Sequence, residues 1–217
     1  MIDRLAASSD LADVRQLEAV GFRSWPSQRT VFDGTWAIRL TANHAAKRLN
    51  SVNPLDRGDI ANLESRIVQA AKRFQNAGRP LIFRLSPLAP PELETILETR
   101  GWKPFDESIV MTADLDRMDF ENVVDQVPLQ NTGRWIDQCI EMGSVSKLQK
   151  PGLLTLIAAV EGEVGLFLAE SGDGRALSAA MAVRFGKLVG LFEVVADPGT
   201  RGQGHGKMIV KSALQWA

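Results

Sequence analysis

The sequence contains no tyrosine and only one cysteine, Cys139. A single cysteine excludes an internal disulfide, which suits a protein of the reducing cytosol. Acidic and basic residues nearly balance, with a net charge of -1, so no general surface for nucleic acid or membrane is expected. The first ten residues lack the apolar core of a signal peptide, and no apolar run is long enough to span a bilayer. We therefore expect a cytoplasmic protein with no nucleic-acid partner and no membrane partner.

The sequence also has little that could bind a metal ion. It contains two histidines, His44 and His205. His44 has no second histidine or cysteine nearby to complete a set of ligands. We interpret His44 as a solvated loop residue and expect no metal.

The most informative stretch of the sequence lies near its C-terminus. Residues 188–196 are mostly apolar and rich in valine, and an Asp-Pro-Gly turn follows, which predicts a largely buried strand. Three glycines then alternate, at Gly202, Gly204 and Gly206, before a segment without glycine or proline that predicts a helix. The free N–H groups and the dipole at a helix start attract anions, and glycines let the backbone come close. This order of elements predicts a phosphate-binding site.

Two nucleotide-binding motifs do not fit the spacing of these glycines. A Walker loop needs Ser or Thr after Gly-Lys, but Met208 follows Lys207. A dinucleotide fingerprint needs G-x-G-x-x-G and an acidic residue on a following strand. The glycines here are spaced G-x-G-x-G, and the sequence stops after the helix.

The segment from Arg201 to Gly206 resembles the acyl-CoA-binding motif of the GNAT acetyltransferase superfamily. The motif is matched by a strand, an Asp-Pro turn, an arginine and glycines in the same order. The alternative interpretation of this segment is an ordinary tight strand-to-helix connection. The resemblance implies that the strand binds pantetheine and that the loop holds the pyrophosphate of acetyl-CoA. The residues that it assigns to the cosubstrate are Val194, Val195, Ala196, Arg201, Gly202, Gln203, Gly204, His205, Gly206 and Lys207. The family commonly has an apolar residue in place of His205, which we interpret as a loop residue rather than a catalyst.

The remaining pattern predicts two halves of similar order. Helices are expected over 11–22, 59–77, 91–100, 132–142 and 148–160, and strands over 34–40, 47–54, 80–85, 102–105, 108–113, 164–170 and 176–185. Each half has a helix, two strands, a turn with proline and Arg-Gly, and a further helix, which is a weak internal repeat. The charged segment 114–122 is interpreted as a linker. We predict an α/β fold with mixed α+β sheets, a tandem GNAT-like acyl-CoA N-acyltransferase with domains over 1–115 and 116–217.

The first half lacks a complete glycine loop. Its corresponding segment, Asn53 to Asp59, keeps proline, arginine and glycine but not the alternating glycines. The carboxylate of Asp59 would also repel a phosphate. We interpret residues 1–115 as a degenerate domain that holds no CoA. In this respect the chain looks like bacterial tandem acetyltransferases, most of which have no assigned substrate.

The resemblance implies transfer of acetyl from acetyl-CoA to a primary amine of a small molecule or protein. Glu193 is the only carboxylate on the predicted strand and is the candidate base, although strand alternation could instead direct it to solvent or to a buried partner on the face opposite Phe192. A backbone N–H of Val194 or Val195 is the candidate oxyanion donor. The family's usual acid is a tyrosine, which is absent here. The alternatives are a non-catalytic acyl-CoA-binding or regulatory module, or an incomplete fragment.

The C-terminal helix is expected to need further cover. In the family pattern another strand follows it and forms the second wall of the pantetheine site. Without that strand, Ile209, Val210, Leu214 and Trp216 would lose part of their packing, at roughly 1.5–3 kcal/mol for each fully buried side chain. We predict that the second copy is truncated and the native protein continues beyond Ala217, or that the first domain or a partner chain covers the helix. A homodimer is among the expected assemblies.

Overall fold

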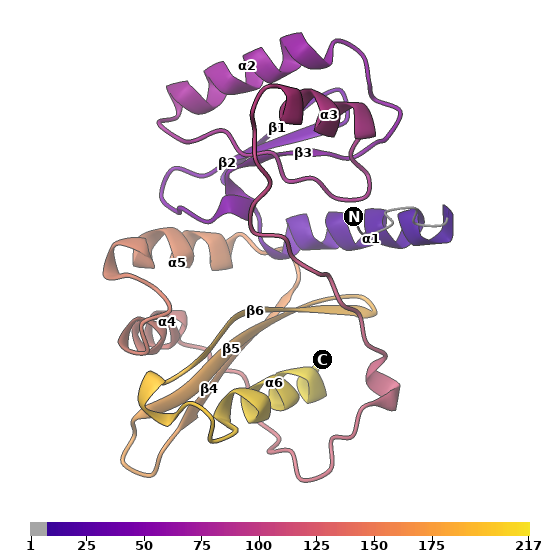
Figure 1. Cartoon of the computed structure of the whole chain (residues 1–217). Helices are drawn as coiled ribbons and strands as arrows, with labels where there is room; N and C mark the ends of the chain where they lie inside the picture. The colour runs from indigo at the N-terminus through magenta and orange to yellow at the C-terminus, as the bar shows by residue number, and fades with distance from the viewer. Residues whose placement is uncertain (1–7) are drawn as a thin grey trace. The chain divides into compact units, whose positions relative to one another are not determined.

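The computed structural model describes residues 8–217 and divides into two compact units (Figure 1). Unit 1 runs to Phe22 and resumes over Pro26–Val110, and unit 2 comprises Arg23–Trp25 and Met111–Ala217. Each unit contains its own three-stranded antiparallel sheet. The predicted α+β character is therefore confirmed.

The sheet of unit 1 consists of β1 (Arg29–Asp33), β2 (Trp36–Leu40) and β3 (Ser51–Pro54), in that order. The predicted hairpin is confirmed by the antiparallel pairing of β2 with β3. Strand β3 is shorter than the strand predicted over 47–54, because the first residues of that range form the 3-10 helix η1 (Lys47–Leu49). Our predictions missed β1, whose pattern of exposure shows little burial on either face.

A short extended segment lies parallel to β3. Val52 N donates to Ile82 O at 2.8 Å, and Arg84 N donates to Val52 O at 2.9 Å. Only the single bridge between Val52 and Phe83 is formed there. The strand predicted over 80–85 is therefore reduced to this bridge.

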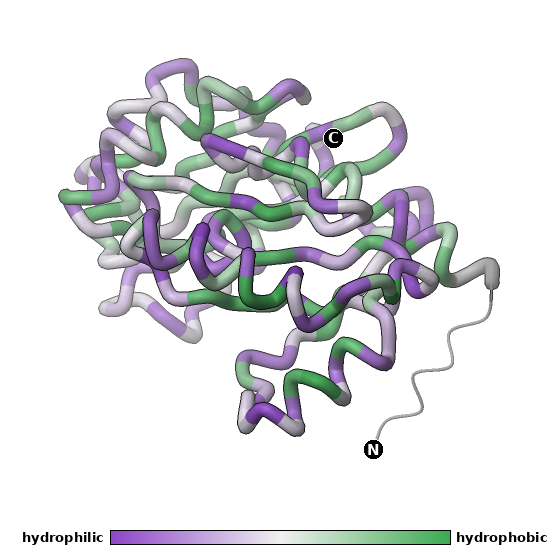
Figure 2. The backbone as a smooth tube through the Cα atoms, turned by 90° about the horizontal axis from the view of Figure 1, so that it is seen from above, coloured by the Kyte–Doolittle hydropathy of each residue, from purple (hydrophilic) through white to green (hydrophobic). Residues whose placement is uncertain are grey.

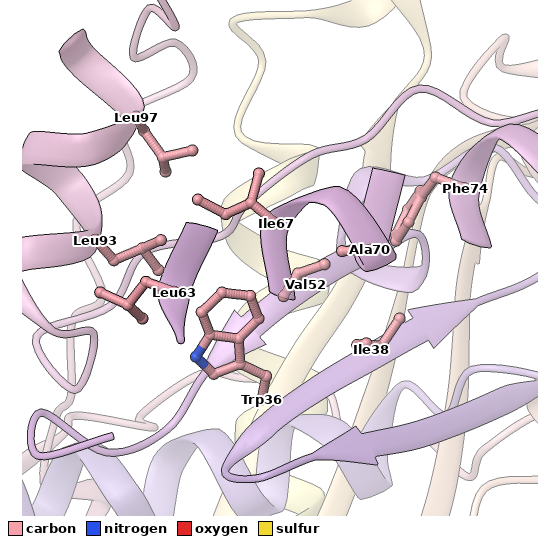
Figure 3. Packing of buried hydrophobic residues seen from close by; sticks show 9 residues of the cluster. All are labelled: Trp36, Ile38, Val52, Leu63, Ile67, Ala70, Phe74, Leu93 and Leu97. Carbon is pink, nitrogen blue, oxygen red and sulfur yellow. The ribbon is translucent and has the colours of Figure 1, made fainter. Parts of the chain in front are cut away.

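The helices of unit 1 are α1 (Ser8–Ser24), α2 (Leu63–Asn76) and α3 (Pro91–Thr99). Apolar residues recur every three or four positions along α2, so one face of this helix packs on the sheet. Figure 3 shows the resulting core, in which Trp36 of β2 lies among side chains of α2 and α3. Its members are Trp36, Ile38, Val52, Leu63, Ile67, Ala70, Phe74, Leu93 and Leu97.

Two predicted strands are not formed. Residues 102–105 and 108–113 have no regular structure, and Ile109, Val110 and Met111 are exposed. Their composition favours extended backbone, but strand propensity reflects packing against neighbours, and no neighbouring strand pairs with this segment among residues 8–217. The prediction was wrong because it used composition without a partner strand.

Unit 2 begins with an irregular segment that contains the 3-10 helix η2 (Leu115–Arg117). The helix α4 (Thr132–Glu141) follows, as predicted, and then η3 (Lys147–Gln149) and α5 (Lys150–Ala158). Pro151 stands in the first turn of α5, where a missing N–H costs nothing, so it begins that helix rather than interrupting it.

The sheet of unit 2 is a meander of β4 (Glu163–Glu170), β5 (Ala176–Phe185) and β6 (Leu188–Ala196). The short η4 (Pro198–Thr200) and the last helix, α6 (His205–Trp216), follow β6. All three strands and the helix were predicted from the sequence.

Helix α6 covers one face of this sheet (Figure 1). Ile209 and Ala213 of α6 are buried against Phe167, Ala180 and Ala182 of the strands. Helix α4 contacts β4 and β5, and the indole N–H of its buried Trp135 donates to Phe167 O at 2.9 Å. Both α6 and α4 therefore pack on strands of this sheet, and the packing of α6 positions the segment after β6.

Hydropathy alternates at short intervals along the chain, as Figure 2 shows. Within residues 8–217, none of the helices combines the length and the apolar character needed to cross a membrane.

Candidate functional site

The loop between β6 and α6 adopts the left-handed conformation that its glycines were expected to allow. Gly202 has a φ of 82° and Gly204 a φ of 88°. An added Cβ at either position would meet no atom within 4 Å. Glycine is therefore required here by backbone conformation rather than by lack of space.

The first turn of α6 presents its backbone N–H groups beside this loop. Gly204 is the N-cap, and its carbonyl accepts from Met208 N at 3.0 Å. Within the described chain no acceptor is found for the N–H groups of His205, Gly206 and Lys207, as helix geometry requires for a first turn. These donors and the positive end of the helix dipole make the position suitable for an anion.

Hydrogen bonds hold the loop to the end of the sheet. Asp197 N donates to Leu177 O at 2.9 Å, and Thr200 N donates to Asp197 O at 3.0 Å. The Ser178 hydroxyl donates to His205 O at 3.1 Å. Asp197 thus acts as a turn residue, as expected, and its carboxylate lies 3.4 Å from the Arg175 guanidinium.

A β-bulge interrupts β6 just before the residues assigned to pantetheine. Met181 of β5 lies opposite Phe192, and Ala179 lies opposite Val195. Glu193 and Val194 therefore both face the single residue Ala180, which defines a bulge. Glu193 has a φ of 48°, which is rare for a residue with a side chain and costs roughly 1–3 kcal/mol. Such backbone strain is concentrated at functional sites, and no pattern in the sequence predicts the positive φ of Glu193.

The bulge changes the argument about Glu193. Strand alternation cannot assign its side chain to a face, because the extra residue breaks the alternation. Burial, together with the negative charge of Glu193, raises the pKa of the Cys139 thiol to about 12. The carboxylate therefore lies near α4, which carries Cys139. It is half-buried, which leaves it partly accessible to water.

The residues before the bulge are fixed by an aromatic stack within unit 2. The rings of Trp25 and Phe192 are 5.2 Å apart and nearly parallel, at 3°. Trp25 is almost completely buried. This stack fixes the backbone immediately before Glu193.

The structure therefore gathers the predicted site residues at one end of the sheet. β6 pairs with β5 along one edge, and no strand among residues 8–217 pairs with its other edge. Val194 is exposed, Val195 is buried and Ala196 is half-buried. Arg201, Gln203 and Lys207 are exposed around the loop. The site is thus an open strand edge that leads to a set of free backbone donors.

The segment of unit 1 that was predicted to correspond to the glycine loop, Asn53 to Asp59, ends in an internal ion pair. Asp59 accepts from Thr35 N at 2.8 Å and from the Thr35 hydroxyl at 2.7 Å. It also accepts from Arg66 Nη1 at 2.8 Å and Nη2 at 3.0 Å. These contacts, above all those with Arg66, lower the pKa of Asp59 to about 2. The carboxylate stays charged close to the start of α2, which disfavours a second anion there.

The prediction that His44 is solvated was wrong. His44 is only 7% exposed, and its Nδ1 accepts from Ala46 N at 3.2 Å. Burial and the charge of Arg79 lower the pKa of His44. Arg79 also donates to the carbonyls of Thr41 and Ala42, close to His44 in the chain. Because Arg79 is far from His44 in the sequence, local sequence could not predict this burial. No cluster of potential metal ligands occurs within the part of the chain that the structure describes.

Comparison with known proteins identifies the class to which this chain belongs. Residues 11–217 match the family described as the C-terminal region of the probable histone acetyltransferase Rv0428c, so the chain belongs to this acetyltransferase family. It is similar to an uncharacterized N-acetyltransferase, YobR, of Bacillus subtilis (strain 168). The two are 24% identical over 216 residues, which is 94% of this chain and 83% of YobR. No solved structure matches the chain.

Proposed function

We propose that the protein is a GNAT-type N-acetyltransferase that transfers acetyl from acetyl-CoA to a primary amine of a small molecule or protein. The observation that carries the proposal is the loop at residues 201–207, where glycines with positive φ lead into the unpaired N–H groups of α6. Phosphates bind such a helix start through both hydrogen bonds and the helix dipole. The family assignment and the similarity to YobR support acetyl transfer.

The pantetheine arm is assigned to the free edge of β6 beyond the bulge. Val194 to Ala196 run along this edge and end at the turn that begins the loop. An extended arm can hydrogen-bond to an unpaired strand edge in the way that an added strand does. The thioester carbonyl would then lie beside the bulge, with a backbone N–H of Val194 or Val195 as oxyanion donor.

The chemical step requires a base. The amine nitrogen forms a bond to the acetyl carbon, the carbon–sulfur bond breaks, and the nitrogen loses a proton. We assign this proton to Glu193, directly or through a water molecule, because its half-buried carboxylate is placed by the bulge. The CoA thiolate takes up a proton from water, since the sequence offers no tyrosine for this role.

A second candidate function is a non-catalytic acyl-CoA-binding or regulatory module. The absence of tyrosine favours it, because the usual acid for the leaving thiolate is missing. Both functions require the same loop. They differ in whether CoA thiol is released when an amine is added.

We further propose that the units are two copies of one GNAT-like arrangement, of which unit 1 is degenerate. Each unit has an antiparallel meander followed by a turn and a helix that packs on the sheet. In unit 1 the ion pair of Asp59 with Arg66 stands where unit 2 has free donors. CoA binding is assigned to unit 2 alone.

The test is isothermal titration of CoA and acetyl-CoA into the full chain and two variants at Gly204. Gly204→Asp and Gly204→Asn carry side chains of nearly equal size at the same φ of 88°. The backbone strain is therefore matched, and only the aspartate places a negative charge against phosphate. We expect the aspartate variant to lose binding and the asparagine variant to retain a measurable part of it. Wild-type binding no tighter than that of Gly204→Asp would refute the proposal.

A further inference from the structure

Unit 1 contains an open pocket beside the C-terminal end of α2. Its volume is about 320 Å³, and residues of β1, β2 and α2 line it. Ligand pockets usually measure roughly 300–1,000 Å³, so this pocket is large enough for a small molecule. None of the residues assigned to acetyl-CoA contributes to the lining. The pocket is therefore a feature of unit 1 that the glycine loop does not explain.

Apolar side chains of the sheet form the inner part of the pocket. Val31 of β1 lies opposite Ile38 of β2, and Arg29 lies opposite Leu40. Residues directly opposite each other in an antiparallel pair share one face of the sheet. Ile38 lies in the core beneath α2, at the end where Figure 3 shows Phe74, so this face is the one on which α2 packs. Ile38 is buried and Val31 and Leu40 are half-buried, so the inner lining is apolar and only partly accessible to water.

The pocket exists because α2 leaves the edge strand uncovered. The core under this helix takes side chains from β2 and β3 but none from β1. Arg73, Asn76 and Ala77 follow the spacing i, i+3 and i+4, so they share one side of the end of the helix. These three residues and the uncovered strand form the two walls of the pocket.

Two exposed arginines give the pocket a positive charge. Arg29 belongs to β1 and Arg73 to α2, and within residues 8–217 neither forms an ion pair. No aspartate or glutamate lines the pocket, and Asp33, the acidic residue of β1, pairs with Arg66 instead. The two positive charges exceed the roughly half negative charge at the end of a helix. Because like charges repel, this arrangement favours an anionic ligand.

We propose that this pocket binds a small monocarboxylic acid with an apolar tail. A guanidinium group holds a carboxylate through two parallel hydrogen bonds, and the Asn76 amide offers a further donor. The tail of the acid would lie on the apolar inner lining, with which an inorganic anion makes no favourable contact. The inference does not rest on acetyl transfer, because the pocket lies in the unit to which no CoA is assigned.

The first experiment compares four probes by nuclear magnetic resonance of the full chain labelled with nitrogen-15. Hexanoate is the test ligand, hexanamide has the same length without the charge, acetate lacks most of the tail, and inorganic phosphate is a free anion. We expect hexanoate to shift the amide signals of residues 29–31, 38–40 and 73–77 in a saturable manner. Hexanamide should bind at least about tenfold more weakly, as expected for a lost charged hydrogen bond. Acetate should also lose at least about tenfold, since each buried methylene adds roughly fourfold in affinity.

The second experiment repeats the hexanoate titration with variants of the exposed cations. Arg29→Gln and Arg73→Gln should each weaken binding at least about tenfold. The matched control is Lys72→Gln, which removes the same charge from an exposed position of the same helix that does not line the pocket. This control should stay within about twofold of wild type.

Each result supports or overturns the assignment. Equal binding of hexanamide and hexanoate would show that the arginines do not recognise a carboxylate. Phosphate binding as tight as that of hexanoate would make this a site for free anions, and the organic-acid assignment would be wrong. The absence of a saturable shift at residues 29–31, 38–40 and 73–77 would refute the site itself. A titration with CoA reports on the glycine loop separately, so failure of this inference and failure of the proposed function are distinguishable.

Discussion

Glu193 has two unusual properties. Its φ is positive, and its negative charge helps to raise the pKa of the buried Cys139 thiol. We predict that Glu193→Gln lowers the rate of acetyl transfer by about 10²–10⁴-fold, the range for loss of a general base. The affinity for CoA should remain near that of wild type, because glutamine has the same shape and the loop is untouched. The measurement is the rate of CoA thiol release as a function of pH, together with a CoA titration. A pH–rate profile that does not change in the variant would assign Glu193 to structure alone.

Asp59 gives a stability prediction with a defined pH window. Its pKa is about 2 in the folded chain and 3.8 in its unperturbed state, so its ion pair stabilises the fold above about pH 4. That contribution disappears as the pH falls from about 4 to 2 and the carboxyl group becomes protonated. Asp59→Asn should lower the free energy of unfolding by about 1–3 kcal/mol at pH 7, with a difference that shrinks towards pH 2.

Urea titrations at several pH values would measure this window. The matched control is Asp125→Asn, an exposed aspartate in the irregular segment. Its free energy of unfolding should lie within about 0.5 kcal/mol of wild type at every pH. A cost for Asp59→Asn that does not depend on pH would contradict the ion-pair argument.

Helix α6 is the element whose packing positions the loop. Ile209 is almost completely buried against the sheet, so Ile209→Ala should lower the free energy of unfolding by about 2–5 kcal/mol. Leu148→Ala removes a side chain that is 92% exposed and should cost less than about 0.5 kcal/mol. Urea unfolding of the two variants tests the comparison, and similar costs at both positions would show that α6 is not firmly packed. Val210, Leu214 and Trp216 on the same helix are half-buried. That further residues, the first domain or a partner chain cover these side chains stays a prediction.

The helices and strands differed in how accurately local sequence predicted their positions. The strands β4, β5 and β6 and the helices α4 and α6 have strong periodicity and clear turn residues, and they formed where expected. Residues 108–113 have the composition of a strand but no partner, and they stayed irregular. β1 lies at the edge of its sheet with little burial, so it left no hydrophobic alternation to detect.

At the scale of the whole molecule, the two units predict a single CoA site. Unit 2 offers the unpaired donors of α6, whereas unit 1, in the proposed correspondence of the two units, has the carboxylate of Asp59 at that place. Titration of CoA should therefore give a stoichiometry of one per chain. Gly204→Asp should abolish that one site rather than halve the binding. A measured stoichiometry of two would show that Asp59 does not exclude the ligand.

Local sequence was sufficient to predict the order of strand, turn, glycine loop and helix over residues 188–217. These features depend on local periodicity and on the conformations open to glycine and proline, which nearest neighbours encode. The same stretch resembles the GNAT acetyltransferases, and the comparison assigns the chain to an acetyltransferase family.

Features that join distant residues could be seen only in the folded chain. The bulge at Glu193 depends on the pairing of β6 with β5, because only a partner strand shows that two residues face one. The ion pair of Asp59 with Arg66 and the attachment of segment 119–124 to α6 likewise need contacts across the fold. Their free energy comes from groups that meet only after folding, so no local pattern in the sequence records them.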